Sequence, residues 1–214
     1  DEAKISFENR GQGQFEFKWQ YSATESSQNA DFGQYYEMID NLHRVLAAVD
    51  GVPALNAAEE SEKTKIKAEL IALRGVAHFE LITRFMPSGY DAGALGVPIM
   101  LKSDLLGKPT RNTVGEVMAQ IEADLQTGRD ESLIPDASPD YLSISHAAIA
   151  AYQARAALLR KDWAKAASYA TEAITLSGAT IISFDNYPYY WQDADETETI
   201  WKFRNNTAPQ LLWR

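Results

Sequence analysis

The chain has 214 residues, enough for one large domain or two small ones, and its 45% hydrophobic and 23% charged residues are ordinary for a globular protein. A net charge of −10 argues against nucleic-acid binding, which depends on lysine and arginine side chains meeting phosphates. Because the chain has no cysteine, it can form no disulfide, thiolate nucleophile or cysteine-ligated zinc site. No apolar run approaches the ~20 residues that a membrane helix needs.

Residues 1–30 are polar, with Phe15, Phe17, Trp19 and Tyr21 at every second position. Alternation with period two predicts a short strand or an extended segment. The first residues lack the basic and then apolar pattern of a signal peptide, and the last residues resemble an interior segment. We therefore expect a fragment or a processed chain.

The first helix is predicted from about Asp31 to Val49. Its apolar residues recur at steps of three and four, the spacing of one helix face: Phe32, Tyr35, Tyr36, Ile39, Leu42, Leu46 and Val49. Because they belong to this stripe, we interpret Tyr35 and Tyr36 as core residues. We expect Gly51 to end the helix in the left-handed conformation that favours glycine.

Two capping boxes predict the starts of the next two helices. Asn56 with Glu59, and Thr113 with Glu116, each place a side-chain acceptor three residues before an acid. The first of these helices should run to about Phe85, and the apolar residues on most sides of its second half predict burial there.

A helical hairpin is predicted next. Ser143 or Ser145 caps a helix that runs to about Arg160, and a tight turn then leads into a helix that Gly178 ends. Small residues that let two antiparallel helices approach are typical of one tetratricopeptide (TPR) unit: Ala154, Ala157, Ala166, Ala170 and Ala173. We assign Trp163 to packing at the turn. A true array repeats every ~34 residues, and the stretch GRDESLIPDASPDYL one period earlier is no helical hairpin.

Short extended pieces are expected between and after the helices. They are residues 96–101 and the segments IISF and ETIWKF, which flank an aromatic loop NYPYYWQDADE. We therefore predict a few short strands joined by long loops.

Catalytic signatures such as G-x-S-x-G and H-E-x-x-H are missing, and we expect no cofactor. Asp193, Asp195 and Glu196 lack the spacing of a calcium loop, so we interpret them as a solvated acidic loop. The histidines fall on different predicted helices and are interpreted as packed or helix-face residues rather than metal ligands: His43, His78 and His146. A carboxylate pair for glycoside hydrolysis cannot be read from sequence, because such pairs form in space.

Four stretches in this order carry a family resemblance: FGQYYEMIDNLHRVLAAVDGV, KAELIALRGVAHFELITRFMPSGY, GVPIMLKSDLLGKPTRNTVGEVMAQIEADL, and SISHAAIAAYQARAALLRKDWAKAASYATEAI followed by ETIWKF. The chain resembles the SusD/RagB-like proteins, the surface nutrient-binding lipoproteins of Bacteroidetes. Members are usually more than twice this long, and neither their C-terminal half nor their lipid-bearing N-terminal cysteine has a counterpart here.

The resemblance implies a mostly α-helical fold of TPR-like hairpins, with a few short strands and long loops, as part of an α-α superhelix. We expect a single domain over residues 1–214. Its parts would be an extended polar and aromatic segment at 1–30, a helical TPR-like core at 31–177, and a loop with short strands at 178–214.

The resemblance also implies a function in binding, without catalysis of a reaction. A SusD-like protein captures an extracellular nutrient, most often a glycan or oligosaccharide, for import by a SusC-like TonB-dependent transporter. It works on the extracellular face of the outer membrane, held by a lipid anchor that is absent from this chain. Three alternatives stay open: a TPR-type adaptor that binds peptides, a glycoside hydrolase, and a SusD-like protein for a non-glycan nutrient such as a peptide.

Aromatic rings in polar loops are the candidate ligand-binding residues, since sugars stack their C–H faces on rings and offer hydroxyls to polar groups. The candidates are Trp19, Tyr21, Asn29, Tyr90 and Trp191, the last in a cluster with Tyr187, Tyr189 and Tyr190. In SusD-like proteins the segment before the aromatic helix contributes to the glycan site, which favours the first three candidates. For each ring the alternative is packing against the core.

Overall fold

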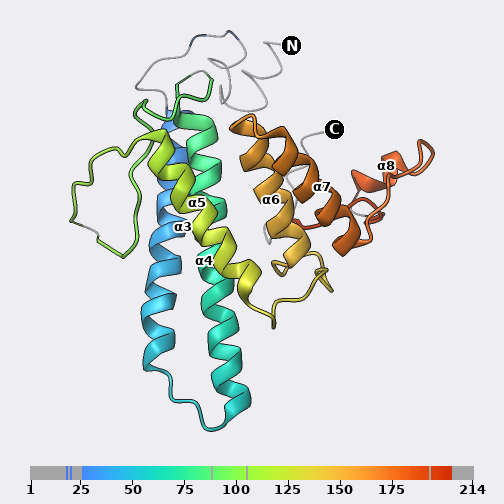
Figure 1. Ribbon diagram of the computed structural model, residues 1–214, viewed down its shortest axis with the longest axis horizontal. Coiled ribbons are helices and arrows are strands. Elements are labelled where there is room, and N and C mark those ends of the chain that lie inside the picture. Colours follow the sequence, from blue (N-terminus) through green and yellow to red (C-terminus); the bar gives the residue numbers. More distant parts are fainter. Residues whose placement is uncertain are drawn as a thin grey trace, which may run out of the picture.

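The computed structural model describes Lys18, Gln20 and residues 26–203 apart from Ser88, Leu105 and Asp193; within the first helix, side chains are described from Phe32 onward. This part of the chain forms six helices (Figure 1): α3 (Ser26–Gly51), α4 (Ala57–Phe85), α5 (Val114–Asp130), α6 (His146–Leu159), α7 (Trp163–Ser177) and the short α8 (Tyr187–Tyr190). The predicted mostly α-helical fold is confirmed.

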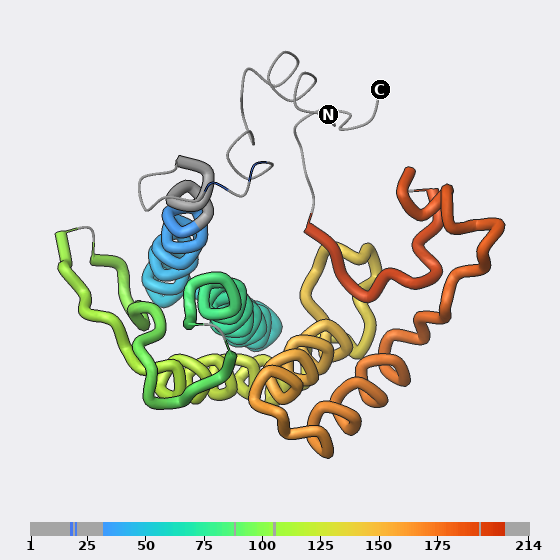
Figure 2. Tube along the Cα trace, turned by 90° about the horizontal axis from the view of Figure 1, so that it is seen from above, coloured from blue at the N-terminus to red at the C-terminus, as the bar shows by residue number. Residues whose placement is uncertain are grey.

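The helices pack mainly as sequence neighbours, α3 on α4, α4 on α5, α5 on α6 and α6 on α7. The long helices α3 and α4 stand side by side, and the hairpin of α6 and α7 lies on the other side of α5 (Figure 1). Seen from above, the described elements form a crescent (Figure 2). One arm holds α3 and the loop between α4 and α5, and the other arm holds α7 and α8.

Helix starts follow their capping residues. The Asn56 side chain accepts a hydrogen bond from the Glu59 N–H at 3.0 Å, which begins α4. At α5 the box is reciprocal, since Thr113 Oγ1 accepts from the Glu116 N–H at 3.2 Å and the Glu116 carboxylate accepts from the Thr113 N–H at 2.8 Å. Of the two serines proposed for α6, Ser145 is the cap.

Two details at the ends of α3 differ from the sequence prediction. The helix begins at Ser26 rather than Asp31. The prediction missed these first residues because they are polar and carry no apolar stripe from which a helix could be recognised. Gly51 is its last helical residue and is not left-handed, so that prediction is wrong. Gly178 ends α7 as expected, and its φ of 67° is left-handed.

The core forms where α4, α5 and α6 meet. Its fully buried members include residues from each of these helices and from the loop before α5: Val76, Phe79, Leu81, Ile82, Val97, Val117, Ile121, Leu125 and Ile149. The expected burial of the second half of α4 is confirmed. Gly128 permits the close approach, since a Cβ atom there would lie 2.8 Å from both Ala72 Cβ and Ile149 Cδ1.

A buried ion pair crosses the α4–α5 interface. Arg74 donates from Nε and Nη2 to the two oxygens of Asp124, at 2.8 and 2.6 Å. The Asp124 side chain is 2% exposed and also accepts from Gln120 Nε2 at 2.7 Å. Because its oxygens have several donors, this carboxylate can stay charged inside the protein.

The hairpin of α6 and α7 matches the predicted TPR-like pair, with Asp162 capping α7. Trp163 contradicts the prediction that it packs at the turn, because its side chain is 62% exposed. It is the first residue of α7, a helix that buries only Ala166 and Ala173. The small residues therefore bring the two helices together without enclosing the indole.

The few short strands predicted from sequence do not form in the described residues, which contain one isolated bridge, between Leu95 and Thr113. The segments after α7 make single backbone hydrogen bonds to different partners, from Thr180 to Thr197 and from Lys202 to Tyr141. Separate contacts of this kind hold an extended chain in place but build no ladder.

Candidate functional site

Three of the five predicted ligand residues cannot be placed. Trp19 and Tyr21 lie outside the described residues, and so does the side chain of Asn29, whose backbone belongs to α3. Their role in ligand binding stays a prediction. The described part of the chain places the other two, Tyr90 and Trp191, on separate elements.

Tyr90 lies in the loop after α4, where it is half-buried and packs against the core. The loop between α4 and α5 and the segment around α8 occupy opposite arms of the crescent (Figure 2). Among the described residues Tyr90 packs against the core, whereas Trp191 contacts Tyr187 and Tyr190, and no contact joins the two predicted residues.

Trp191 stands at the end of α8 as the centre of an exposed aromatic cluster. The Tyr187 and Tyr190 rings meet its ring edge to face, with centroids 6.0 and 5.8 Å away. Trp191 is 71% exposed, and Tyr187 and Tyr189 are 49% and 54% exposed. We name these four residues, Tyr187, Tyr189, Tyr190 and Trp191, the α8 aromatic cluster. An open indole beside phenol hydroxyls can stack on a sugar ring and bind its hydroxyls.

The acidic residues after this cluster are used within the chain. Asp195 accepts a hydrogen bond from the Thr197 N–H at 2.9 Å, and hydrogen bonds from Thr197 hold the pKa of this carboxyl below its usual value. Glu196 pairs with Lys202. Among the residues that the structure describes, no group of three histidine, aspartate or glutamate side chains could hold a metal ion.

His43 and His78 are packed residues, as predicted, and they share a partner. His78 is fully buried; its Nδ1 donates to the Arg74 carbonyl at 3.0 Å, so its Nε2 can accept from the Met100 N–H at 3.3 Å. His43 Nε2 donates to the Met100 carbonyl at 3.0 Å. Burial lowers the pKa of His78 to about 4, which keeps the ring neutral near pH 7. The two rings hold the backbone of Met100 between α3 and α4.

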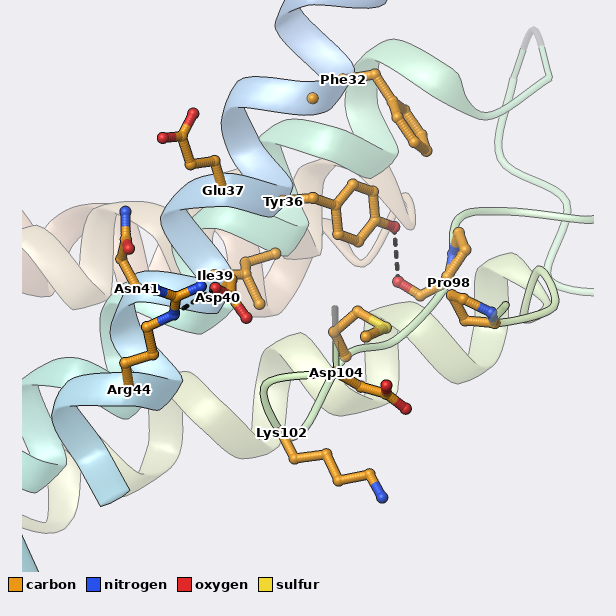
Figure 3. Close-up of a pocket in the computed structure, with 13 residues that line it drawn as sticks. Phe32, Tyr36, Glu37, Ile39, Asp40, Asn41, Arg44, Pro98, Lys102 and Asp104 are labelled. Carbon is orange, nitrogen blue, oxygen red and sulfur yellow. Dashed lines mark hydrogen bonds and ion pairs between the residues drawn. The ribbon is translucent and has the colours of Figure 1, made fainter. Parts of the chain in front are cut away.

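A groove of about 540 Å³ lies between α3 and the segment of residues 98–109 (Figure 3). We name it the α3 groove. Its floor is apolar: Phe32, Tyr36, Ile39, Pro98, Met100 and Pro109. Its rim is polar and charged: Glu37, Asp40, Asn41, Arg44, Lys102 and Asp104. Such a site, apolar below and polar at its edge, has the general composition of small-ligand sites.

Two simple periodicities build this groove. On α3 the lining residues follow steps of four, such as Phe32, Tyr36 and Asp40, which places them on one helix face. In the opposite wall every second residue faces α3, including Pro98, Met100 and Lys102, as in an extended chain.

Polar contacts fix the two walls relative to each other. The Tyr36 hydroxyl donates to the Pro98 carbonyl at 2.7 Å, the bond drawn in Figure 3. Ser103 Oγ donates to Asp40 Oδ1 at 2.5 Å, and Arg44 Nε lies 2.7 Å from Asp40 Oδ2. The hydrogen bond from Ser103 is the main cause that lowers the pKa of Asp40. Burial raises the pKa of Tyr36, so its hydroxyl stays a donor.

The sequence prediction missed this groove. Tyr35 and Tyr36 do pack against the core as expected, but both are only half-buried, and the Tyr36 ring also lines the groove. The available signal was the polar row of Glu37, Asn41 and Arg44 beside the apolar stripe of the same helix. That row alone does not reveal which distant segment will form the second wall.

Comparison with known proteins identifies the fold and the family. A family model described as starch-binding and associating with the outer membrane matches residues 5–158. A SusD superfamily protein from Bacteroides thetaiotaomicron is 25% identical, with a TM-score of 0.70, over 80% of this chain and 38% of its own. No curated protein matches the chain.

Two more distant solved structures share the fold. A putative sugar-binding protein from Bacteroides vulgatus is 23% identical with a TM-score of 0.72, over 88% of this chain and 42% of its own. A laminarin-binding SusD-like protein is 21% identical with a TM-score of 0.64, over 80% of this chain and 36% of its own. The chain thus spans about two fifths of the length of these proteins. Given the family match over most of its residues, the chain belongs to the SusD-like family.

Proposed function

We propose that the chain captures a glycan at the extracellular face of the outer membrane, for import by a SusC-like TonB-dependent transporter. The observation that carries the proposal is the family match over residues 5–158, whose description is starch-binding and associating with the outer membrane. The laminarin-binding relative supports the same ligand class, because it shares this fold. In this proposal the protein binds the glycan without cleaving it.

The α8 aromatic cluster is the described surface that best supports sugar stacking, because Trp191 exposes 71% of its side chain. An exposed indole that has two tyrosines against its ring, rather than a buried packing partner, gains from covering its open face with a ligand. Trp19, Tyr21, Asn29 and Tyr90 remain proposed ligand residues, and their contribution is to be measured in the same way.

Membrane attachment is proposed to come from a lipid anchor in the longer protein. None of the helices in the described part of the chain is long and apolar enough to cross a bilayer. The transporter partner would be tested by co-purification with a SusC-like protein from the outer membrane, using the longer lipidated protein.

Calorimetric titration with oligosaccharides derived from starch and from laminarin tests glycan capture, with analysis of each sugar for cleavage afterwards. We expect saturable heat and intact sugar. Trp191→Ala should weaken binding about tenfold or more, the effect of losing one stacked ring of roughly 1–3 kcal/mol.

Trp163→Ala is the matched control, because Trp163 is similarly exposed, at 62%, but stands at the start of α7 away from α8. It should leave the affinity unchanged, and Trp19→Ala extends the same measurement to the N-terminal segment. Cleaved sugar would contradict the non-enzymatic function. The absence of saturable heat with every sugar would contradict glycan capture by this chain.

A further inference from the structure

We propose that the α3 groove is a second carbohydrate site, separate from the α8 aromatic cluster, and that it takes an uncharged sugar ring in preference to an acidic one. The ligand class rests on the proposed function, whereas the location and the charge preference rest on the groove itself.

Four polar side chains at the rim of the groove have no side-chain partner among the residues that the structure describes. Glu37, Asn41, Lys102 and Asp104 make no side-chain hydrogen bond or ion pair within the described part of the chain. Asp40 and Arg44, in contrast, are already bound to each other and, through Asp40, to Ser103. The free groups include two acceptors, one amide and one ammonium donor, which together match the hydroxyls of a sugar.

The apolar floor of the groove would pack best against an apolar face of the same ligand. The Tyr36 ring lies beside Pro98, whose carbonyl accepts a hydrogen bond from the Tyr36 hydroxyl at 2.7 Å (Figure 3). Met100 also lines the groove. A wholly apolar ligand would cover the floor but remove water from the free rim groups without replacing their hydrogen bonds, which costs free energy. A pyranose ring meets both demands with its C–H face and its equatorial hydroxyls.

The charges of the rim disfavour an acidic sugar. Three carboxylates line the groove against two cations, and Arg44 is already paired with Asp40. Glu37 and Asp104 then face a ligand with only Lys102 to offset them. The whole chain adds a net charge of −10, which repels polyanions at longer range. An uncharged sugar avoids both repulsions.

The groove is formed before any ligand binds. Its second wall is tied to α3 at Pro98 and at Met100, and again where Ser103 meets Asp40. Its volume of about 540 Å³ falls inside the roughly 300–1,000 Å³ of small-ligand sites. A site with fixed walls loses little conformational entropy on binding. Because the groove and the α8 aromatic cluster lie on opposite arms of the crescent, each can be altered without touching the other (Figure 2).

Amide NMR of the 214-residue chain, with affinities measured in parallel, tests the proposal. The probes are starch- and laminarin-derived oligosaccharides as neutral sugars and oligogalacturonate as the acidic one. We expect neutral sugars to shift amide signals of α3 and residues 98–104, and oligogalacturonate to bind this site at least about tenfold more weakly.

Gly33→Leu should narrow the groove, because Gly33 lines it, and a Cβ atom there meets nothing within 4 Å. It should weaken binding at the groove about tenfold. Ala48→Leu is the matched control, a new leucine at an exposed position of the same helix outside the groove. Lys102→Ala should weaken binding about threefold, while Lys108→Ala, in the same loop but not in the groove lining, should not.

The outcomes separate the two proposals. Shifts on α3 that Gly33→Leu abolishes and Ala48→Leu preserves support the second site. Binding that shifts only amides near α8 overturns the groove site and leaves glycan capture standing. Equal affinity of the groove for oligogalacturonate overturns the charge preference. If no sugar binds anywhere, both proposals fall.

Discussion

The body of α3, α4 and α5 and the hairpin of α6 and α7 are both helical but are buried very differently. In the body, α4 and α5 carry a continuous buried face and a buried ion pair. In the hairpin, α6 is buried against α5, whereas α7 buries only Ala166 and Ala173. The helices α5 and α7 are of comparable length, 17 and 15 residues, yet they bury different amounts of surface. We therefore expect the stability of the described chain to be concentrated in the body.

The ion pair of the body gives the largest expected effect. Arg74→Ala leaves the Asp124 carboxylate, 2% exposed, without its main partner. We expect a loss of about 3–5 kcal/mol in the free energy of unfolding, because an uncompensated buried charge is costly. Chemical denaturation measures it. Lys165→Ala, which removes an exposed pair with Asp162 on the hairpin, should cost less than about 1 kcal/mol. Equal losses would contradict the comparison.

His78 makes the stability of the body depend on pH. Its pKa in the folded protein is about 4 because of burial, below the 6.5 of an exposed histidine. Between these two pH values the unfolded chain binds more protons than the folded chain. The contribution of neutral His78 to the free energy of unfolding is therefore fully present above pH 6.5 and is lost as the pH falls towards 4.

The expected loss over this window is about 3 kcal/mol, from roughly 1.4 kcal/mol per pKa unit. The measurement compares the pH dependence of unfolding in the wild-type chain and in His78→Gln, since carboxylates titrate in both. The variant should be less stable near pH 7 but should lose less on acidification. Identical slopes would show that His78 does not carry the effect.

A substitution at Gly128 tests the packing between the body and the hairpin, because this residue of α5 lies against both α4 and α6. Gly128→Ala introduces a Cβ atom 2.8 Å from Ala72 Cβ and from Ile149 Cδ1. We expect a net loss of about 1–3 kcal/mol from overpacking, in spite of the better helix propensity of alanine. Gly33→Ala, whose Cβ atom meets nothing within 4 Å, should instead stabilise by about 0.5–1 kcal/mol. Thermal or chemical unfolding of the two variants should give opposite signs.

The smallest effect on stability is expected for an exposed isoleucine of the hairpin, and a buried isoleucine of the body is its reference. Ile174 on α7 is 59% exposed, and Ile121 on α5 is fully buried. Ile174→Ala should change the free energy of unfolding by no more than about 0.5 kcal/mol, and Ile121→Ala should cost about 2–5 kcal/mol. A large loss for Ile174→Ala would mean that the exposed face of α7 is packed in solution.

The features that could be predicted from the sequence are those fixed by residues close together along the chain. The caps at Asn56 and Thr113 and the end of α7 at Gly178 depend on residues close together in sequence, so the starts of α4 and α5 and the end of α7 were predicted correctly. The start of α3 was missed because its first turns are polar. Strand formation depends on a distant partner, and ETIWKF found a single backbone contact to Tyr141 instead of a ladder.

The candidate sites show the same limit. Trp191 could be named from its loop, because an aromatic cluster in a polar segment is visible along the chain. The exposure of Trp163 could not be predicted, since the turn motif says nothing about what covers the indole. The α3 groove needs residues 98–109 to lie against residues 32–44 of α3, which are more than fifty positions earlier, and Tyr36 to meet Pro98 across 62 positions.

The anchoring of Met100 by His43 and His78 bears on how binding preference can evolve. Both histidines bind main-chain atoms, the carbonyl and the N–H of one residue, which every amino acid except proline provides. Neighbouring positions such as Lys102 and Asp104 can therefore mutate without loss of this attachment. The backbone of this groove wall is held by hydrogen bonds to its main-chain atoms, whereas the side chains that would contact a ligand are free to vary. Substitutions at a few exposed positions can therefore change which ligand is preferred while the fold is kept.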